Sequence, residues 1–237
     1  MKLTAFAVSD IGCHRSENED SNLCEVDLGL FAVADGIGGL PGGAQASQCA
    51  LATLREWFAP QAAATTLDYT AAVTAANDAV VQLGHQISPR YGIGTTLTLA
   101  HIAADKLHVL HVGDSALFRL HGGAIGVLTR DHSVKSDHAY ATARGESPEP
   151  YFGNPHALTR CVGQPPPLAA DHSEYALASG DRYLVCTDGI TRCITPYEIQ
   201  RQLAEASDAK SAAETLVALA RERGGFDNAT AVVLFVD

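Results

Sequence analysis

Apolar and polar residues follow one another along the first third of the chain in patterns that predict strands followed by helices. Residues 2–10 and 28–35 are short apolar runs that are typical of strands. Residues 44–58 and about 68–87 instead carry an apolar residue every three or four positions, and a Ser-Pro pair ends the second segment. Two helices of this length can cover one face of a sheet.

The middle of the chain predicts more strands. Strand-like runs occupy residues 94–103, 106–113, 115–121 and 124–129, and short turns join them. Because short turns connect neighbouring strands, we expect these strands to be antiparallel. The periodicity then disappears over residues 131–156, where glycines and prolines interrupt a polar stretch. A loop this long inside a domain is usually functional or mobile.

The last third predicts two further strands, a second pair of helices and a final strand. Thr195 and Glu198 have the spacing of a capping box, which predicts the start of one helix, and Asp208 can cap the next. Residues 229–236 are apolar throughout, which is typical of a buried strand. Helix pairs in both halves of the chain favour two stacked sheets with helices outside, in one domain over residues 1–237.

Composition and charge narrow the classes of function. The chain has a formal net charge of −11 and no basic run, which argues against a nucleic-acid binder. No apolar stretch is long enough to span a membrane or to form a signal peptide, so we expect a cytoplasmic protein. The scattered cysteines and histidines show no spacing that favours a disulfide framework or a zinc site.

Acidic residues stand in turns directly after apolar strands, where side chains gather at the end of a sheet. They are Glu19-Asp20, Asp35, Asp114, Asp188 and Asp227. A single acidic residue at such a place is most often a turn former, but this set is too large for ordinary turns. Converging carboxylates repel one another unless they bind divalent cations. Oxygen ligands favour Mg²⁺ or Mn²⁺, and two such ions about 3.5–4 Å apart would support hydrolysis of a phosphate ester.

Eight segments in order along the chain resemble the metal-dependent serine/threonine protein phosphatases of type 2C, the PPM family, in their bacterial single-domain form. The segments are SDIGCHRSENEDS, FAVADGIGGLPGGAQAS, GIGTTLTLAHI, LHVLHVGDSALFRL, LTRDHS, LTRCVG, DRYLVCTDGI and GGFDNATAVVLFV. The resemblance implies an α+β fold, a four-layer α-β-β-α sandwich of two mainly antiparallel sheets flanked by helix pairs. It also implies a flap beside the active site at residues 131–156.

The resemblance further implies a role for individual ligands. Asp35 would bridge two metal ions and would be a catalytic residue. The Gly36 carbonyl and Glu19 would bind the second ion, and Asp188 and Asp227 would complete the first.

Four more residues receive roles from the resemblance. Asp114 would help to hold a third, weaker ion. Asp20 would lie behind the ligands, and Asn228 would hold the loop of Asp227 or a metal-bound water. Arg15 would be the catalytic clamp on the phosphoryl group, because a guanidinium can donate to two oxygens at once. The alternative for Arg15 is a surface ion pair with a neighbouring glutamate.

Two positions depart from the family pattern. Ile37 follows the Asp35-Gly36 pair where animal members carry a histidine, so the group that protonates the leaving alkoxide is not identified. Ala116 follows a Gly-Asp-Ser segment where the family usually has an arginine, so any contact made by that arginine is missing.

The sequence therefore predicts hydrolysis of phosphoserine and phosphothreonine on proteins by a hydroxide that bridges two Mn²⁺ or Mg²⁺ ions. The implied partners are phosphorylated proteins and a cognate serine/threonine kinase. We expect a monomer that binds neither nucleic acid nor membranes. The pathway, the physiological metal and the individual substrate are not specified by these residues.

Four alternatives stay open at this point. Cys186 and Arg192 have the C-x₅-R spacing of cysteine-based phosphatases, although Asp188 between them would repel a phosphate. Glycines in the 36–43 turn suggest a nucleotide-phosphate cradle, but no known fingerprint is complete. Ala116 is the one feature that supports a catalytically weak or dead regulatory binding module. A small-molecule phosphatase is the fourth alternative.

Overall fold

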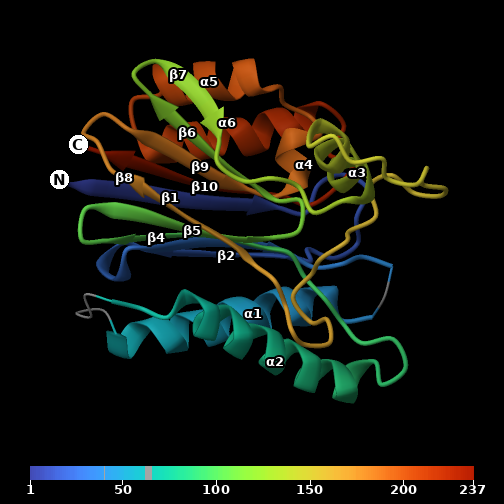
Figure 1. Cartoon of the computed structure of the whole chain (residues 1–237). Coiled ribbons are helices and arrows are strands. Elements are labelled where there is room, and N and C mark those ends of the chain that lie inside the picture. The colour runs from blue at the N-terminus through green and yellow to red at the C-terminus, as the bar shows by residue number, and fades with distance from the viewer. Residues whose placement is uncertain (40, 62–65) are drawn as a thin grey trace.

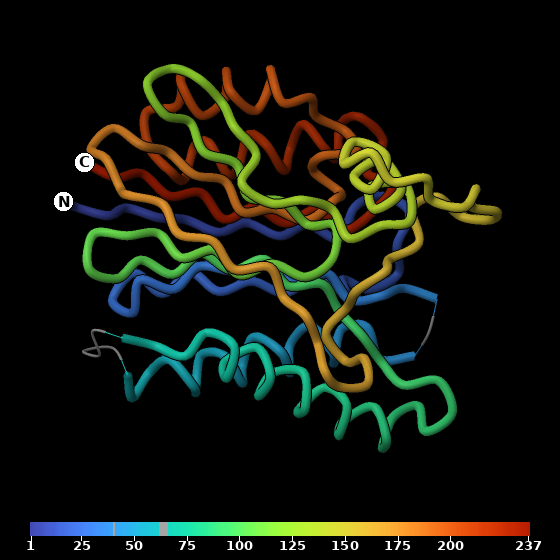
Figure 2. The backbone as a smooth tube through the Cα atoms, in the orientation of Figure 1, coloured from blue at the N-terminus to red at the C-terminus, as the bar shows by residue number. Residues whose placement is uncertain are grey.

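Two five-stranded sheets stack face to face, and helices lie on the outer side of each (Figure 1). This computed structural model describes residues 1–39, 41–61 and 66–237. The layers follow in the order helix, sheet, sheet, helix, and both termini lie at the same end of the sandwich (Figure 2). The predicted α-β-β-α arrangement of antiparallel sheets is confirmed.

The first sheet has the strand order β1-β10-β9-β6-β7, and each neighbouring pair in it is antiparallel. Its strands are β1 (Leu3–Asp10), β6 (Ala116–His121), β7 (Ala124–Val127), β9 (Arg182–Cys186) and β10 (Ala229–Val236). Its outer face is covered by α5 (Pro196–Glu205) and α6 (Ala209–Glu222). The first and last strands of the chain therefore lie side by side.

The second sheet has the order β2-β3-β4-β5-β8 and is also antiparallel throughout. Its strands are β2 (Asp20–Glu25), β3 (Leu30–Asp35), β4 (Leu97–Ala103), β5 (Lys106–Val112) and β8 (Asp171–Ala176). Its outer face is covered by α1 (Gly43–Phe58) and α2 (Tyr69–Ile87). The connections contain η1 (Val26–Leu28), η2 (Ala59–Gln61), α3 (Val134–Ala143) and α4 (Asp188–Thr191). Among the helices that the structure describes, none has the length and apolar character needed to cross a membrane.

Burial on both faces explains why β10 is apolar at nearly every position. Val232 and Leu234 belong to the buried cluster between the sheets, together with Tyr183. Val233 belongs instead to the cluster beneath α6, together with Leu216. A strand buried on both faces needs no alternation of polar residues. Burial of each such side chain contributes about 1.5–3 kcal/mol to stability, so this central strand holds two layers of the sandwich together.

The helix starts predicted from capping patterns are confirmed. The Thr195 hydroxyl accepts from the Glu198 N–H, and the Glu198 carboxylate accepts from the Thr195 N–H at 3.0 Å. Asp208 caps α6 by accepting from the N–H of Ser211 at 2.7 Å. These side chains pair N–H groups that have no partner within the helix itself.

Besides the short 3₁₀ helices η1 and η2, the hydrophobic pattern does not predict β2, α3 and α4. The segment 131–156, expected to be a loop, contains α3. None of the residues in α3 is buried, so the helix has no apolar stripe that periodicity could reveal. The strand β2 lies in a polar segment, and α4 is only a single turn.

Candidate metal centre

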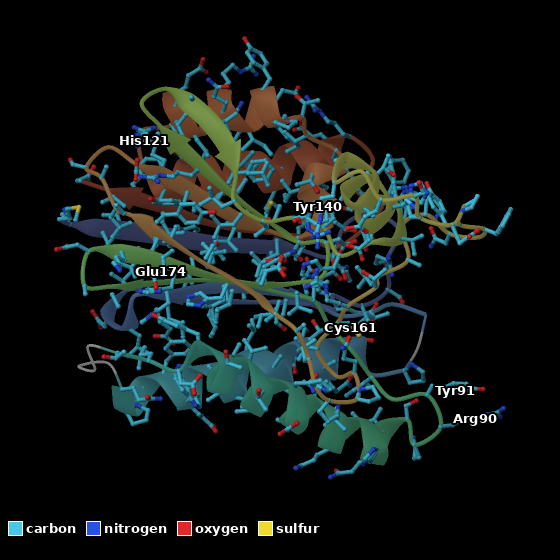
Figure 3. All side chains as sticks on the ribbon, viewed as in Figure 1. Arg90, Tyr91, His121, Tyr140, Cys161 and Glu174 are labelled. Carbon is cyan, nitrogen blue, oxygen red and sulfur yellow. The ribbon has the colours of Figure 1, made fainter. Side chains whose placement is uncertain are left out.

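The acidic residues found in the sequence meet at one end of the two sheets, in a cavity of about 530 Å³. The predicted site residues that line it are Arg15, Glu19, Asp35, Gly36, Asp114, Asp188, Asp227 and Asn228. Asp20 does not line the cavity, but it pairs directly with Asp35 across β2 and β3. Cys161, labelled in Figure 3, lines the same cavity on the side of the second sheet.

The second sheet supplies Glu19 and Asp35. Asp35 ends β3, where its N–H donates to Thr96 Oγ1 at 2.9 Å. Its carbonyl accepts from the Thr96 N–H at 2.8 Å and from the Thr95 hydroxyl at 2.9 Å. Glu19 directly precedes β2, and its carbonyl accepts from the Gly36 N–H at 3.1 Å. The pairing of β2 with β3 therefore brings both carboxylates to the same end of the sheet.

Asn228 ties the segment of Glu19 to the first sheet. Its Oδ1 accepts from the Glu19 N–H at 2.8 Å. Its Nδ2 donates to the carbonyl groups of Ile11 and Glu17 at 2.9 and 3.0 Å. The buried amide of Asn228 therefore makes all three of these hydrogen bonds to backbone groups. Because Asn228 directly follows Asp227 in the chain, these hydrogen bonds hold Glu19 next to Asp227.

The first sheet supplies Asp188 and Asp227. Asp188 is the first residue of α4 and is separated from the end of β9 by Thr187 alone, and Asp227 lies in the turn before β10. Asp114 lies in the turn between β5 and β6. There the Gly113 N–H donates to His132 Nδ1 at 3.1 Å, and the His132 N–H donates to the Gly113 carbonyl at 2.7 Å. Three connections from distant parts of the chain therefore converge on one cavity.

Glycines leave the space that the site side chains occupy. A Cβ on Gly43 would lie 2.2 Å from Glu19 Oε1, and a Cβ on Gly38 would lie 2.9 Å from Arg15 Nη1. A Cβ on Gly36 would lie 2.3 Å from the Gly43 carbonyl oxygen. Side chains at these three positions would clash, so close packing around the site accounts for the glycines.

Burial raises the pKa of several carboxyl groups in the site. It is the main cause of the rise to about 7 for Asp20 and for Asp114, and repulsion from Asp188 adds to both. The pKa of Asp35 is raised well above its ordinary value by burial and then by the surrounding carboxylates. Burial also raises the pKa of Asp188. A divalent cation would offset both the burial and the repulsion of these charges.

Two buried carboxylate oxygens, Asp20 Oδ1 and Asp188 Oδ1, have no hydrogen-bond partner among the described residues. The other oxygen of Asp20 accepts from the hydroxyls of Thr187 and Thr230 at 2.8 and 2.7 Å. A buried acceptor that lacks a partner costs about 1–3 kcal/mol. Unpaired carboxylate oxygens are ligands that Mg²⁺ and Mn²⁺ prefer, so the residues present fit the expected metals.

Two arginines face these carboxylates. Arg15 Nη2 lies 2.8 and 2.9 Å from the two oxygens of Asp227, and Arg15 Nη1 lies 3.7 Å from Glu19 Oε2. Arg192 forms ion pairs with Asp188 and, at 3.2 Å, with Asp227. In the sequence, Arg192 stands out only as part of a C-x₅-R motif. Its spacing of four residues from Asp188, on the same side of a helical turn, is the signal that places it here.

Further residues at the cavity are Ile37 and the end of the segment 131–156. Ile37 lines the cavity. Asn154 and His156 also line it, so this segment borders the site, although neither residue was expected there. Ala116, by contrast, is buried at the start of β6.

The cysteine alternative does not fit the structure. Cys186 is fully buried in β9, and burial, followed by the nearby Asp188, raises the pKa of its thiol. A nucleophilic cysteine needs both access and a thiolate. The glycine-rich turn packs against site residues and its own backbone, which gives no support to a nucleotide cradle. Leu40 of that turn lies outside the described residues.

Comparison with known proteins agrees with this geometry. The family model described as "Protein phosphatase 2C" matches residues 16–230. The chain belongs to the protein phosphatase 2C family. One relative of this 2C-family chain is the protein phosphatase PhpP of Streptococcus pneumoniae, which is 29% identical over 247 residues. The alignment covers 96% of this chain and 95% of PhpP.

Solved structures include similar folds. One is described as PppA, a key regulatory component of T6SS in Pseudomonas aeruginosa, with a TM-score of 0.83 and 29% identity over 100% of this chain and 99% of that one. Another is the catalytic domain of the serine threonine protein phosphatase PstP in complex with two manganese ions. Its TM-score is 0.82 at 30% identity, over 99% of both chains.

Proposed function

We propose that this 2C-family chain is a metal-dependent phosphatase that removes phosphate from phosphoserine and phosphothreonine on proteins. The observation that carries the proposal is the convergence of carboxylates from both sheets on one cavity, with two guanidinium groups facing them. The names of the relatives, which include protein and serine/threonine phosphatases, support the substrate class.

The proposed ligands are those that the cavity brings together. Asp35 would be shared by two ions, with Glu19 and the Gly36 carbonyl on one of them. Asp188 and Asp227 would bind the other. When bound, Mn²⁺ or Mg²⁺ would supply an activated water and neutralise charge on the phosphoryl group.

The remaining residues would position these groups and the substrate. Asp114, which shares the cavity with Asp188, would help to hold a third, weaker ion. Asp20 lies behind Asp35, and hydroxyl donors fix one of its oxygens. Arg15 is half-exposed at the cavity, so its guanidinium can exchange the carboxylate for a phosphoryl group.

We further propose a single phosphatase domain over residues 1–237, with residues 131–156 as a flap beside the site. Two residues of that segment, Asn154 and His156, line the cavity, which supports this role. The proposal includes a monomer that works in the cytoplasm and reverses the action of a cognate serine/threonine kinase. All six cysteines are free thiols, which suits a reducing compartment.

The test is hydrolysis of a phosphothreonine peptide by the purified protein, first in EDTA and then after addition of Mn²⁺. We expect activity only with metal and a preference for the phosphothreonine peptide over a matched phosphotyrosine peptide. Activity that survives EDTA but that a thiol-alkylating reagent abolishes would contradict the proposal.

The matched variant is Asp35→Asn, which keeps the shape of the side chain and removes the shared charge. We expect kcat to fall by more than about 100-fold, since loss of a mere supporting contact to a metal ligand already costs 10–100-fold. Folding should be retained, because Asp35 contributes no apolar packing. Wild-type turnover in this variant would remove Asp35 from the site.

A further inference from the structure

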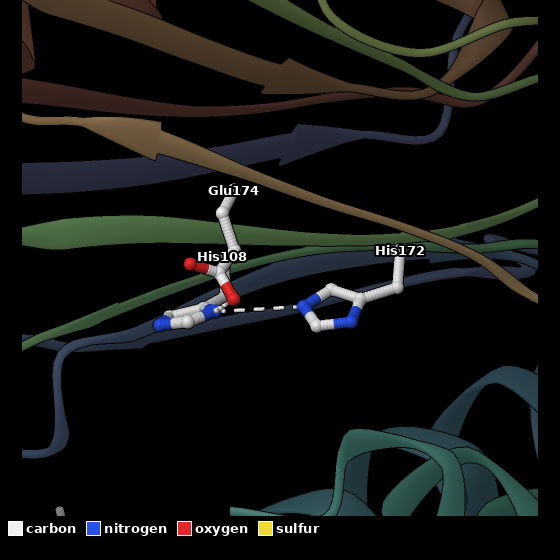
Figure 4. Close-up of side chains that lie close together, drawn as sticks. All are labelled: His108, His172 and Glu174. Carbon is white, nitrogen blue, oxygen red and sulfur yellow. Dashed lines mark hydrogen bonds and ion pairs between the residues drawn. The ribbon is translucent and has the colours of Figure 1, made fainter. Parts of the chain in front are cut away.

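A second group of side chains suited to bind a metal lies on the outer face of the second sheet. It consists of His108 on β5 and His172 and Glu174 on β8, hereafter the histidine cluster (Figure 4). The cluster lines a separate cavity of about 260 Å³, together with Tyr69 and Lys106. None of the residues proposed as ligands of the phosphatase centre lines this cavity.

Strand register brings the three side chains together. His108 is directly opposite Glu174 in the antiparallel pair β5–β8. His172 precedes Glu174 by two residues, so both project from the same face of β8. On one face of an antiparallel pair, a directly opposite residue and its diagonal neighbour both lie within reach of a long side chain.

The ligand atoms already have nearly the spacing of a zinc site. All three lie within 4.8 Å of one another. His172 Nε2 is 3.4 Å from His108 Nδ1, and Glu174 Oε1 is 3.8 Å from the same nitrogen. Bonds of about 2.0–2.1 Å in a tetrahedron place neighbouring ligand atoms about 3.4 Å apart. Little movement is therefore needed to enclose an ion.

Neighbouring side chains hold the cluster in this geometry. The ring of Tyr69 stacks on His108 with centroids 4.6 Å apart, and it lies 4.8 Å from the ring of His172. Lys106 Nζ donates to Glu174 Oε2 at 2.7 Å, while the other oxygen of Glu174 is the one nearer to His108. Contacts of this kind orient the ligands of known metal sites.

The protonation state also suits a ligand. Burial lowers the pKa of His108, and the nearby His172 and Lys106 act in the same direction against the opposite effect of Glu174. A metal ion binds the neutral form of an imidazole, which a lowered pKa favours. Two imidazoles and one carboxylate are typical ligands of zinc and unlike the all-oxygen set of the phosphatase centre.

We propose that His108, His172 and Glu174 bind one Zn²⁺ ion, with water in the fourth position, and that this ion fixes β8 to β5. Among the strands that the structure describes, β8 lies at the edge of the second sheet and pairs with β5 alone. An ion held by both strands would oppose separation of that edge. The site stands independently of the phosphatase activity.

The test is a Zn²⁺ titration of the full chain at pH 7.5 in competition with a chromophoric chelator. Because Zn²⁺ can also enter the carboxylate centre, the Asp35→Asn chain is the reference. We expect His172→Ala in that background to lower the affinity for one equivalent of Zn²⁺ by more than about 100-fold. Loss of a ligand should exceed the 10–100-fold effect of losing a supporting contact. Glu174→Gln, which keeps the side-chain shape, should lower the affinity for the same equivalent of Zn²⁺.

The control is His85→Ala in the same background, because His85 is an exposed imidazole near the end of α2. This variant should bind Zn²⁺ as the reference chain does. In thermal unfolding, Zn²⁺ should raise the Tm of the reference chain and of His85→Ala but not that of His172→Ala. Equal Zn²⁺ binding by all variants, or an equal loss in His85→Ala, would overturn the proposal.

Discussion

Individual residues at the candidate centre combine a high cost of burial with close packing. Asp20 and Asp188 each have a buried oxygen without a partner among the described residues, while Asn228 makes three hydrogen bonds to backbone groups. The hydrogen bonds of Asn228 hold the backbone of the site around Glu19 in place. The remaining unfavourable energy of the site is electrostatic, which a cation relieves.

Replacement of Arg15 by alanine should mainly weaken substrate binding. A hydrogen bond to a charged group contributes about 1.5–3 kcal/mol, so we expect KM to rise about tenfold or more, with a smaller change in kcat. Steady-state kinetics with a phosphothreonine peptide at saturating Mn²⁺ measures this. Arg90→Ala, at an exposed arginine that does not line the cavity, is the control. An unchanged KM for Arg15→Ala would exclude the clamp.

A buried histidine should make the protein sensitive to acid. Burial, with repulsion from His132, lowers the pKa of His111 to about 3. The neutral ring accepts from the Thr98 hydroxyl at 2.9 Å and donates to the Arg130 carbonyl at 3.0 Å. Between about pH 6.5 and 3 the unfolded chain binds a proton that the folded chain does not. The contribution of His111 to stability is therefore present above this window and is lost as the pH falls through it.

The variant His111→Gln tests whether His111 causes this loss of stability at low pH. Glutamine offers a donor and an acceptor, as the neutral ring does, but it does not titrate. Between pH 7 and pH 4.5 the wild type should lose on the order of 2 kcal/mol more stability than His111→Gln. Urea unfolding at the two pH values measures the difference. His85→Gln, at an exposed histidine, should behave as the wild type does. Parallel pH profiles for all three proteins would show that His111 does not cause the acid sensitivity.

At the scale of elements, strand ends and helix starts place the functional groups. Asp35 ends β3, Asp188 starts α4 after β9, and Asp114 lies between β5 and β6. The helices behind the sheets contribute packing and not ligands. Changes at their caps should therefore alter stability without altering the site.

Removal of the α6 cap by Asp208→Ala should lower the free energy of unfolding by about 1 kcal/mol, because the N–H of Ser211 loses its acceptor. Urea unfolding measures this change in the free energy of unfolding. Asp208→Asn retains a capping oxygen, so its free energy of unfolding should fall much less. The activity per folded molecule should be unchanged in both variants. An equal loss of stability in Asp208→Asn would mean that charge, and not capping, is responsible.

At the scale of the whole molecule, the candidate centre joins the two sheets. Glu19 and Asp35 belong to the second sheet, whereas Asp188 and Asp227 flank strands of the first. Ions held by both sets would oppose separation of the sheets. Metal binding and stability should therefore be linked.

Addition of Mn²⁺ should raise the melting temperature of metal-free protein. At a free concentration of about 100 times Kd, binding adds about 2.7 kcal/mol, which corresponds to roughly 5–10 °C for a chain of this size. Differential scanning calorimetry in EDTA and in Mn²⁺ measures the shift. Asp35→Asn should show a much smaller rise. An equal rise in that variant would place the stabilising ion elsewhere.

Much of the fold followed from local patterns. The apolar run at 229–236 predicted β10, while the capping box at Thr195 and the cap at Asp208 predicted the starts of α5 and α6. The helix α3 was missed because it buries no side chain, so that no hydrophobic period marks it. The acidic residues and the family motifs identified most of the proposed ligands, because Asp35, Asp114 and Asp188 stand close to the ends of strands that the apolar pattern marks.

The sequence by itself determined most of the strands and helices and the set of carboxylates, since these depend on residue type and spacing within short segments. Only the tertiary structure placed Arg192 against Asp227, and His108 beside His172 and Glu174. The histidine cluster joins residues more than sixty positions apart, and no local spacing records it. The physical reason is that such contacts are set by strand order and register, which depend on how all the apolar faces of the molecule are buried together.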